Sequence, residues 1–197
     1  MDIELDQFLE PIAHKKGDAR RGLAAIEQAE AEAYALDNDE GLGVRLGFKA
    51  NMMSRADYIH FGEKIVTIIE ASDFKDQFLV CEKELERLKK EDLEIYKAEN
   101  PDENRIQRLT ETTKGRTKPL RKIAYKPLKA EVMQKWCGSI AISERLGRFH
   151  KWEQCPNYRY LILCTDGTDV QVMNNFLSVV QGFCNTAAIF TTSQLKL

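Results

Sequence analysis

Residues 55–72 are Arg55-Ala-Asp57-Tyr-Ile-His-Phe-Gly62-Glu-Lys-Ile65-Val-Thr-Ile-Ile69-Glu70-Ala-Ser72, two apolar runs on either side of a Gly-Glu turn signal. The second run, from Ile65 to Ile69, is almost wholly apolar, as expected of a strand covered on both faces. The pattern therefore predicts a strand, a tight turn and a second strand. Antiparallel pairing would bring Asp57, near the start of the first strand, beside Glu70, near the end of the second.

Asp57 and Glu70 form the candidate functional pair. Two carboxylates that meet at the edge of a sheet can hold a hard divalent cation. A purely structural role for the same two side chains is the alternative, and the hairpin sequence leaves both interpretations open.

Composition sets the broad class of the protein. The chain has 197 residues and a net charge of −2, which suits one domain with a sizeable core and no global preference for nucleic acid or membrane. No run reaches the ~18 apolar residues of a membrane span, and the acidic N-terminus lacks the layout of a signal peptide. Five cysteines without C-x-x-C spacing favour reduced thiols, and therefore the cytoplasm or another reducing compartment.

Hydrophobic periodicity predicts the remaining elements. Helices are expected over 18–36, 78–99, 131–146 and 170–183, and further strands over 43–50, 158–164 and 186–192. This order predicts an α/β fold with one mixed sheet, in which a three-strand meander is joined by a strand–helix–strand unit and flanked by helices. We expect a single domain over residues 1–197, with a basic loop or insertion at about 100–130.

The pattern resembles the PD-(D/E)XK nuclease superfamily. The common core of that superfamily is a helix, a three-strand meander, a helix and a strand. Its motif is an Asp at the start of the second core strand and a Glu or Asp, one residue and a Lys at the end of the third. Asp57 and Glu70 match this motif in position and spacing.

The resemblance implies a restriction-endonuclease-like fold and metal-dependent hydrolysis of phosphodiester bonds in DNA or RNA. It also implies that Mg²⁺ or Mn²⁺ is bound by two carboxylates, a backbone carbonyl and an acidic residue of the first helix. In this chain these ligands would be Asp57, Glu70, Ala71 and Glu30. The alternative for Glu30 is a solvent-facing position on an acidic helix.

The chain departs from the superfamily at Ser72, which occupies the position of the motif lysine. A hydroxyl cannot supply the fixed positive charge that offsets charge developing on the phosphate. Lys75, at the mouth of the following helix, and Lys83, on that helix, are the candidate replacements. Viral cap-snatching endonucleases carry a similarly placed lysine, whereas the alternative for Lys83 is an ordinary surface position.

The position of Ser72 also keeps a second function open. Without a replacement lysine, the chain would be a catalytically inactive nuclease-fold protein. Such a protein would serve as a nucleic-acid-binding or protein-interaction module, together with other subunits of a larger assembly.

A local excess of positive charge follows the second predicted helix. Residues 114–129 contain seven basic residues and no acidic one, and Gly and Pro favour a loop. Such a segment can track a phosphate backbone, with Tyr125 available to stack on a base. A solvated loop that balances the acidic helices is the alternative. The candidate nucleic-acid-binding residues are Lys114, Arg116, Lys118, Arg121, Lys122, Tyr125 and Lys126.

Overall fold

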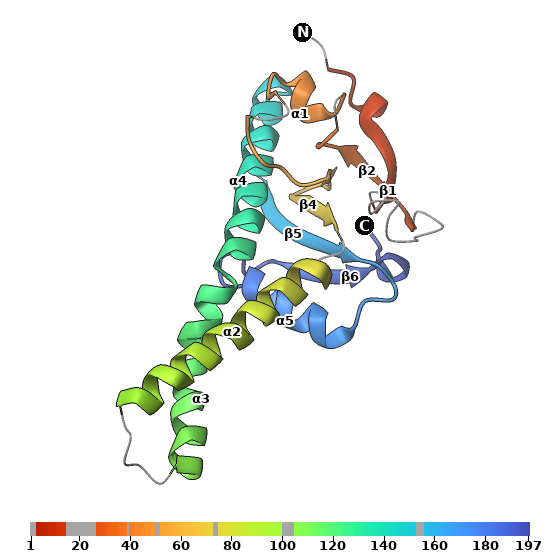
Figure 1. Cartoon of the computed structure of the whole chain (residues 1–197). Helices are drawn as coiled ribbons and strands as arrows, with labels where there is room; N and C mark the ends of the chain where they lie inside the picture. Colours follow the sequence, from red (N-terminus) through yellow and green to blue (C-terminus); the bar gives the residue numbers. More distant parts are fainter. Residues whose placement is uncertain are drawn as a thin grey trace. The chain divides into compact units, whose positions relative to one another are not determined.

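The computed structural model describes residues 3–14, 27–38, 40–49, 52–72, 75–99, 105–152 and 156–197. Its centre is a six-stranded sheet (Figure 1), with the strands β1 (Leu9–Ala13), β2 (Gln28–Ala35), β3 (Tyr58–Phe61), β4 (Ile65–Ala71), β5 (Asn157–Cys164) and β6 (Ala188–Thr191). The helices are α1 (Leu42–Arg45), α2 (Lys75–Glu99), α3 (Arg105–Ala124), α4 (Lys126–Phe149) and α5 (Val170–Val180).

The strands lie in the sheet in the order of the chain. Strands β1 to β4 pair antiparallel, whereas β5 is parallel to β4 and β6 is parallel to β5. The prediction of an α/β fold with a mixed sheet flanked by helices is confirmed. A three-strand meander is present as β2-β3-β4, but its first strand is not the one expected over 43–50. The predicted strand–helix–strand unit is β5-α5-β6.

The first strand of the meander was misplaced by sequence reasoning. Residues 28–35 were expected at the end of a helix and form β2 instead, while residues 18–26 lie outside the described residues. The segment alternates Ala with Glu, Gln or Tyr, and the alanines at 29, 33 and 35 are buried whereas Glu30 and Glu32 are exposed. This period of two matches a half-buried strand and outweighs the helical propensity of Ala and Glu.

Two further expectations are wrong. The strand expected over 43–50 is replaced by α1 and a turn in which Gly47 adopts a φ of 89°, a value that favours glycine. Of the segment expected to be irregular, residues 105–124 form α3, which accommodates Pro119 inside the helix. The missing N–H of Pro119 removes one backbone hydrogen bond without ending the helix.

The chain divides into two compact units. One combines Met1–Phe74 with Glu131–Leu197 and contains the sheet, and the other is Lys75–Ala130, with α2 and α3. Within the second unit, the ring of Phe78 packs edge-on against Tyr125 at 5.9 Å between centroids. None of the helices in the described ranges is both long and apolar enough to cross a membrane. One domain with an insertion at about 100–130 stays a prediction.

Helix α4 is held closely against the loop that precedes β3. The Ala56 N–H donates a hydrogen bond to Ser139 Oγ at 2.9 Å. One residue earlier on the helix, a Cβ atom at Gly138 would lie 2.0 Å from the carbonyl oxygen of Ser54. Only glycine permits this approach of helix to loop. The ring of Trp136 packs edge-on against Tyr160 of β5, which fixes the same helix to the sheet.

Candidate functional site

Asp57 and Glu70 lie at neighbouring ends of β3 and β4. The register pairs Tyr58 with Ile69, and continuing it by one residue sets Asp57 opposite Glu70. Side chains in opposite positions of an antiparallel pair share a face of the sheet. Both residues are buried, with 6% and 1% exposed.

The Asp57 carboxylate is held in place by the backbone of the neighbouring strand. The Ala71 N–H donates a hydrogen bond to Asp57 Oδ2 at 3.0 Å. The carbonyl oxygen of Asp57 also accepts a hydrogen bond from the Leu36 N–H at 2.8 Å, which ties the residue to the end of β2. The carboxylate is therefore fixed beside the residue that follows Glu70.

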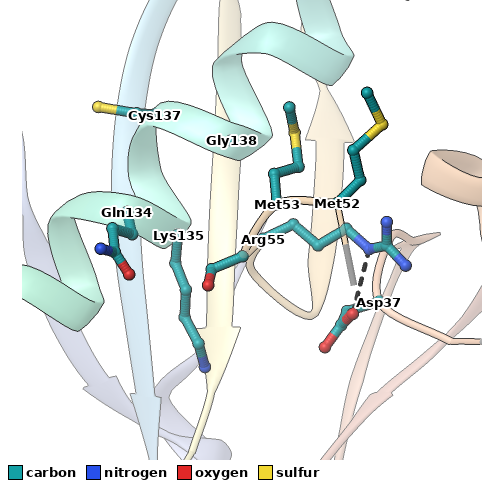
Figure 2. Close-up of a pocket in the computed structure, with 9 residues that line it drawn as sticks. Asp37, Met52, Met53, Arg55, Gln134, Lys135, Cys137 and Gly138 are labelled. Carbon is teal, nitrogen blue, oxygen red and sulfur yellow. Dashed lines mark hydrogen bonds and ion pairs between the residues drawn. The ribbon is translucent and has the colours of Figure 1, made fainter. Parts of the chain in front are cut away.

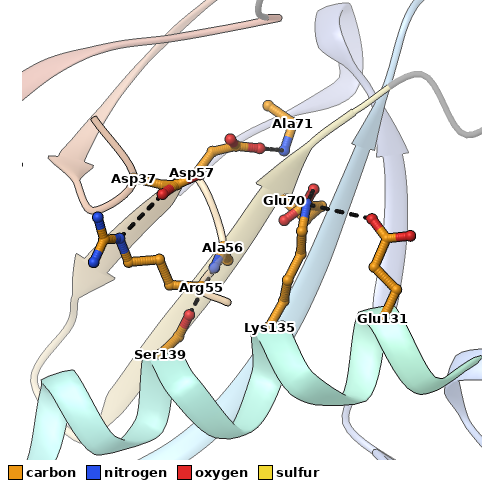
Figure 3. Close-up of polar contacts among 9 residues, drawn as sticks. All are labelled: Asp37, Arg55, Ala56, Asp57, Glu70, Ala71, Glu131, Lys135 and Ser139. Atoms are coloured by element: carbon orange, nitrogen blue, oxygen red, sulfur yellow. Dashed lines mark hydrogen bonds and ion pairs between the residues drawn. The ribbon is translucent and has the colours of Figure 1, made fainter. Parts of the chain in front are cut away.

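A lysine that sequence reasoning missed completes the cluster. Lys135 of α4 donates a hydrogen bond from Nζ to Glu70 Oε1, and its Nζ lies 4.0 Å from Glu131 Oε1 (Figure 3). The Lys135 side chain is 20% exposed and that of Glu70 is 1% exposed, so the ion pair is largely withdrawn from water. A fixed ammonium thus lies against one member of the carboxylate pair.

The charges of Glu70 and Asp57 both raise the pKa of Lys135. Burial by itself lowers this pKa, but the charge and hydrogen bond of Glu70, with further contributions from Asp57 and Glu131, raise it above the usual 10.5. Lys135 is therefore protonated at neutral pH.

Lys135 is 65 residues from Glu70 in the chain, so no motif spacing could identify it. One signal was nevertheless present in the sequence. Lys135 shares a helical face with the buried residues Val132, Ser139 and Ile142, at spacings of three, four and three residues. A lysine on the inward face of a helix needs a partner in the core, and that pattern marks it as unusual.

Tyr160 adds a buried hydroxyl near the carboxylates. It is fully buried on β5, and its phenol oxygen has no hydrogen-bond partner among the described residues. Burial first, then the charges of Glu70 and Asp57, raise the pKa of Tyr160 well above its usual value. The phenol therefore stays protonated over the ordinary assay range.

Of the remaining predicted residues, Ala71 takes part in this cluster through its N–H, whereas Lys75, Lys83 and Glu30 belong to other elements. Lys75 and Lys83 belong to the unit Lys75–Ala130, where Lys83 is exposed on α2 and the Lys75 side chain lies outside the description. The expectation that Glu30 lies on a helix is wrong, since it is exposed on β2. In the described ranges, no three or more His, Cys, Asp or Glu side chains are grouped to hold a metal ion.

The predicted basic loop is helical, and its members have different surroundings. Arg116 forms an ion pair with Asp92 at 3.0 Å, and the Arg121 guanidinium lies over the ring of Tyr125 at 5.2 Å. The prediction that Tyr125 is available to stack on a base is wrong: it is 3% exposed and donates a hydrogen bond to Glu82. The Lys114 side chain lies outside the described residues.

Four exposed lysines form one basic ridge. Helices α3 and α4 are nearly continuous, because the Tyr125 N–H donates to the Arg121 carbonyl and the Lys129 N–H to the Tyr125 carbonyl, both at 3.0 Å. Spacings of four, four and three residues place the lysines on one side of this helical segment. The basic ridge consists of Lys118, Lys122, Lys126 and Lys129.

Comparisons of the chain with protein-family models, curated proteins and solved structures found no match. The function proposed below therefore rests on the geometry and chemistry of these residues.

Proposed function

We propose that the protein is a metal-dependent nuclease that hydrolyses phosphodiester bonds of DNA or RNA. One observation carries this proposal: the ammonium of Lys135 lies against Glu70, which lies opposite Asp57 on the same face at the ends of β3 and β4. Two carboxylates and one lysine are the set that the motif of the PD-(D/E)XK superfamily brings together. Here the lysine would come from a helix rather than from the strand.

The donor atoms at the neighbouring ends of β3 and β4 are of the kind that binds Mg²⁺ or Mn²⁺. The carboxylates of Asp57 and Glu70 and the carbonyl of Ala71 would hold the ion, because hard divalent cations prefer oxygen ligands. A third acidic ligand, from Glu30, stays a prediction. When bound, such an ion lowers the pKa of a coordinated water and shields the charge of the phosphate.

The residues of the chain would contribute orientation and charge. The Lys135 ammonium can donate to a phosphate oxygen or hold the attacking water, and it loses little mobility because Glu70 and Glu131 already position it. The Ala71 N–H holds the Asp57 carboxylate in one orientation. Preorganised charges of this kind stabilise the transition state without reorganising during the reaction.

The topology supports a restriction-endonuclease-like core as part of the same proposal. The meander β2-β3-β4 is followed by a helical section and by β5, parallel to β4. That order agrees with the meander, helix and strand of the superfamily core. Lys135 lies on α4, the last helix before β5, whereas viral cap-snatching endonucleases carry their lysine on the helix after the third core strand, a position that α2 occupies here. The described residues differ from that core in the additional elements β1, α5 and β6, and they contain no α-helix before the meander.

The test is cleavage of labelled single- and double-stranded DNA and RNA with Mg²⁺ or Mn²⁺. We expect Asp57→Asn, Glu70→Gln and Lys135→Gln to lose at least about 100-fold in rate, the order expected for removing one preorganised group. Lys83→Gln and Lys75→Gln are the matched controls and should cleave like the wild type. Circular dichroism confirms that each variant is folded. Cleavage that persists in both carboxylate variants would remove the basis of the proposal.

The basic ridge supports the alternative, a catalytically inactive nucleic-acid-binding module. Its four exposed lysines could contact phosphates whether or not the carboxylates are active. We expect four Lys→Gln changes at 118, 122, 126 and 129 to reduce the salt slope of nucleic-acid binding by up to about 0.9 per phosphate contact. The same change at Lys49, Lys64, Lys151 and Lys196, also exposed, is the control for net charge. Binding with this dependence, without cleavage, would favour the module.

A further inference from the structure

A groove of about 790 Å³ opens between α4 and the loop before β3. One wall is formed by Asp37 and residues 52–55, and the other by Gln134, Lys135, Cys137 and Gly138 of α4. Lys135 is part of this lining and also contacts Glu70. The groove therefore reaches the proposed catalytic cluster through a shared side chain.

The lining of the groove suits a ligand that has an apolar face and polar edges better than it suits a ligand with several phosphates. The guanidinium of Arg55 already has partners within the protein. Its Nε donates to Asp37 at 3.1 Å and its Nη1 donates to the Phe48 carbonyl, and the residue is almost fully buried. Among the lining residues, this leaves Lys135 as the remaining cation. A path for several phosphates would require more than one accessible positive charge.

The accessible part of the lining includes thioether and amide side chains beside the Ser54 hydroxyl and the Cys137 thiol. Met52 is 65% exposed, and Figure 2 shows it beside Met53, with both side chains extending away from the Lys135 ammonium. Sulfur contacts with aromatic rings are favourable, so a planar base can lie against these methionines. The exposed amide of Gln134 offers both a donor and an acceptor to the edge of that base.

The two walls are fixed relative to one another before any ligand arrives. The Ala56 N–H bonds Ser139 Oγ, and the backbone at Gly138 packs directly on Ser54. A groove whose walls are already fixed spares a ligand the entropy cost of ordering them.

We infer that this groove holds one unpaired nucleobase of the substrate, next to the phosphate to be cleaved. The inference deepens the proposed function and rests on it, because the groove meets the catalytic cluster at Lys135. Since a base in a duplex is stacked and paired, the favoured substrate is a single strand or an unpaired nucleotide.

The test compares a labelled single-stranded oligonucleotide with an abasic oligonucleotide of the same length, with Ca²⁺ as the added metal. We expect Met52→Ala, which removes a sulfur–aromatic contact, and Gln134→Ala, which removes a hydrogen bond, each to weaken binding of the intact strand by about 2- to 10-fold. Neither change should alter binding of the abasic strand. Met133→Ala is the matched control, since Met133 is exposed on α4 and is not part of the groove lining.

Cys137 gives a second measurement without a change to the groove. It is an exposed thiol in the lining, whereas Cys81, Cys164 and Cys184 are buried. In a Cys155→Ser background, the intact strand should slow maleimide labelling of Cys137 more than the abasic strand does. Equal effects of the two strands on labelling, or equal losses of affinity for both in Met52→Ala, would overturn the base site.

The outcomes for the groove and for the nuclease are separable. Base-dependent binding without cleavage in Mg²⁺ or Mn²⁺ would sustain the groove and overturn the nuclease. Cleavage by the wild type, together with equal affinities of Met52→Ala and Met133→Ala for the intact strand, would sustain the nuclease and overturn the groove. Failure to bind either oligonucleotide, together with absence of cleavage, would overturn both.

Discussion

The ion pair between Lys135 and Glu70 stabilises a carboxylate that would otherwise be costly to bury. Glu70 is 1% exposed, and an isolated charge at that depth carries a desolvation penalty of several kcal/mol. The attraction between the two groups offsets this penalty only while both are present. Removing either residue alone therefore lowers the free energy of unfolding, because the other charge stays buried without its partner.

This dependence predicts a non-additive stability change. Lys135→Met should lower the free energy of unfolding by about 3 kcal/mol, because it leaves an uncompensated buried carboxylate. The double variant Glu70→Gln/Lys135→Met should recover most of that loss. Urea denaturation of the wild type and the three variants gives the coupling energy. Additive losses would mean that the two side chains do not share a buried contact.

The same pair predicts the direction of a pH dependence. Because the folded-state pKa of Lys135 is raised above its usual 10.5, the pair contributes its full stability below pH 10.5. That contribution is lost as the pH rises through the raised folded-state value. Alkaline titration followed by circular dichroism should therefore destabilise the wild type more than Lys135→Met above pH 10.5.

Tyr160 and Tyr158 predict opposite effects of the same chemical change. The Tyr160 hydroxyl is buried without a hydrogen-bond partner among the described residues, so Tyr160→Phe should leave stability unchanged or raise it by up to about 1 kcal/mol. The Tyr158 hydroxyl donates to the Glu144 carboxylate, so Tyr158→Phe should cost about 1–2 kcal/mol. Thermal unfolding compares the two. A large loss in Tyr160→Phe would indicate that its hydroxyl has a partner in solution.

The residues that sequence reasoning found are those whose partners are local in the chain. Asp57 and Glu70 belong to one hairpin, and a tight turn fixes their pairing. Lys135 and Glu70 are separated in the chain by α2 and α3, and no local pattern encodes a contact over that distance. Tyr125 was misjudged for the related reason that its packing partner, Phe78, lies on another helix.

At the scale of elements, sequence patterns succeeded where burial and propensity agreed. The apolar runs of β4 and β5 are central and parallel, and they were predicted as strands. In β2 the residue type favoured a helix while the alternation favoured a strand, and pairing with β1 and β3 decided the outcome. In α3, Gly115 and Pro119 suggested a loop, yet the helix continues through both.

Two glycines on the successive helices α3 and α4 predict opposite results for one substitution. Gly138→Ala would place a Cβ 2.0 Å from the Ser54 carbonyl oxygen, and we expect a loss of about 2 kcal/mol or more as the loop is displaced. A Cβ at Gly115 meets no atom within 4 Å, so Gly115→Ala should stabilise the protein by about 0.5–1 kcal/mol through helix propensity. Chemical denaturation of both variants measures the difference. Equal effects would contradict the close contact at Gly138.

At the scale of the whole molecule, the two compact units are stabilised by different means. The sheet unit buries long apolar side chains such as Ile68, Ile69 and Ile162. In Lys75–Ala130, much of the described surface of α2 carries exposed ion pairs, including those of Arg87 with Glu84 and Glu91. Such pairs contribute little to stability, so this unit depends on a small set of buried residues: Phe78, Cys81, Leu85, Ala124, Tyr125 and Leu128.

This difference predicts that the helical unit unfolds before the sheet unit. Both tryptophans, Trp136 and Trp152, belong to the sheet unit, whereas α2 and α3 contribute strongly to the far-ultraviolet circular dichroism. We expect the ellipticity to begin falling at a lower urea concentration than the tryptophan fluorescence changes. Phe78→Ala should move only the ellipticity transition, and Leu79→Ala, at an exposed neighbouring position, should move neither. Superimposable transitions in the wild type and in Phe78→Ala would mean that the chain unfolds as one cooperative unit.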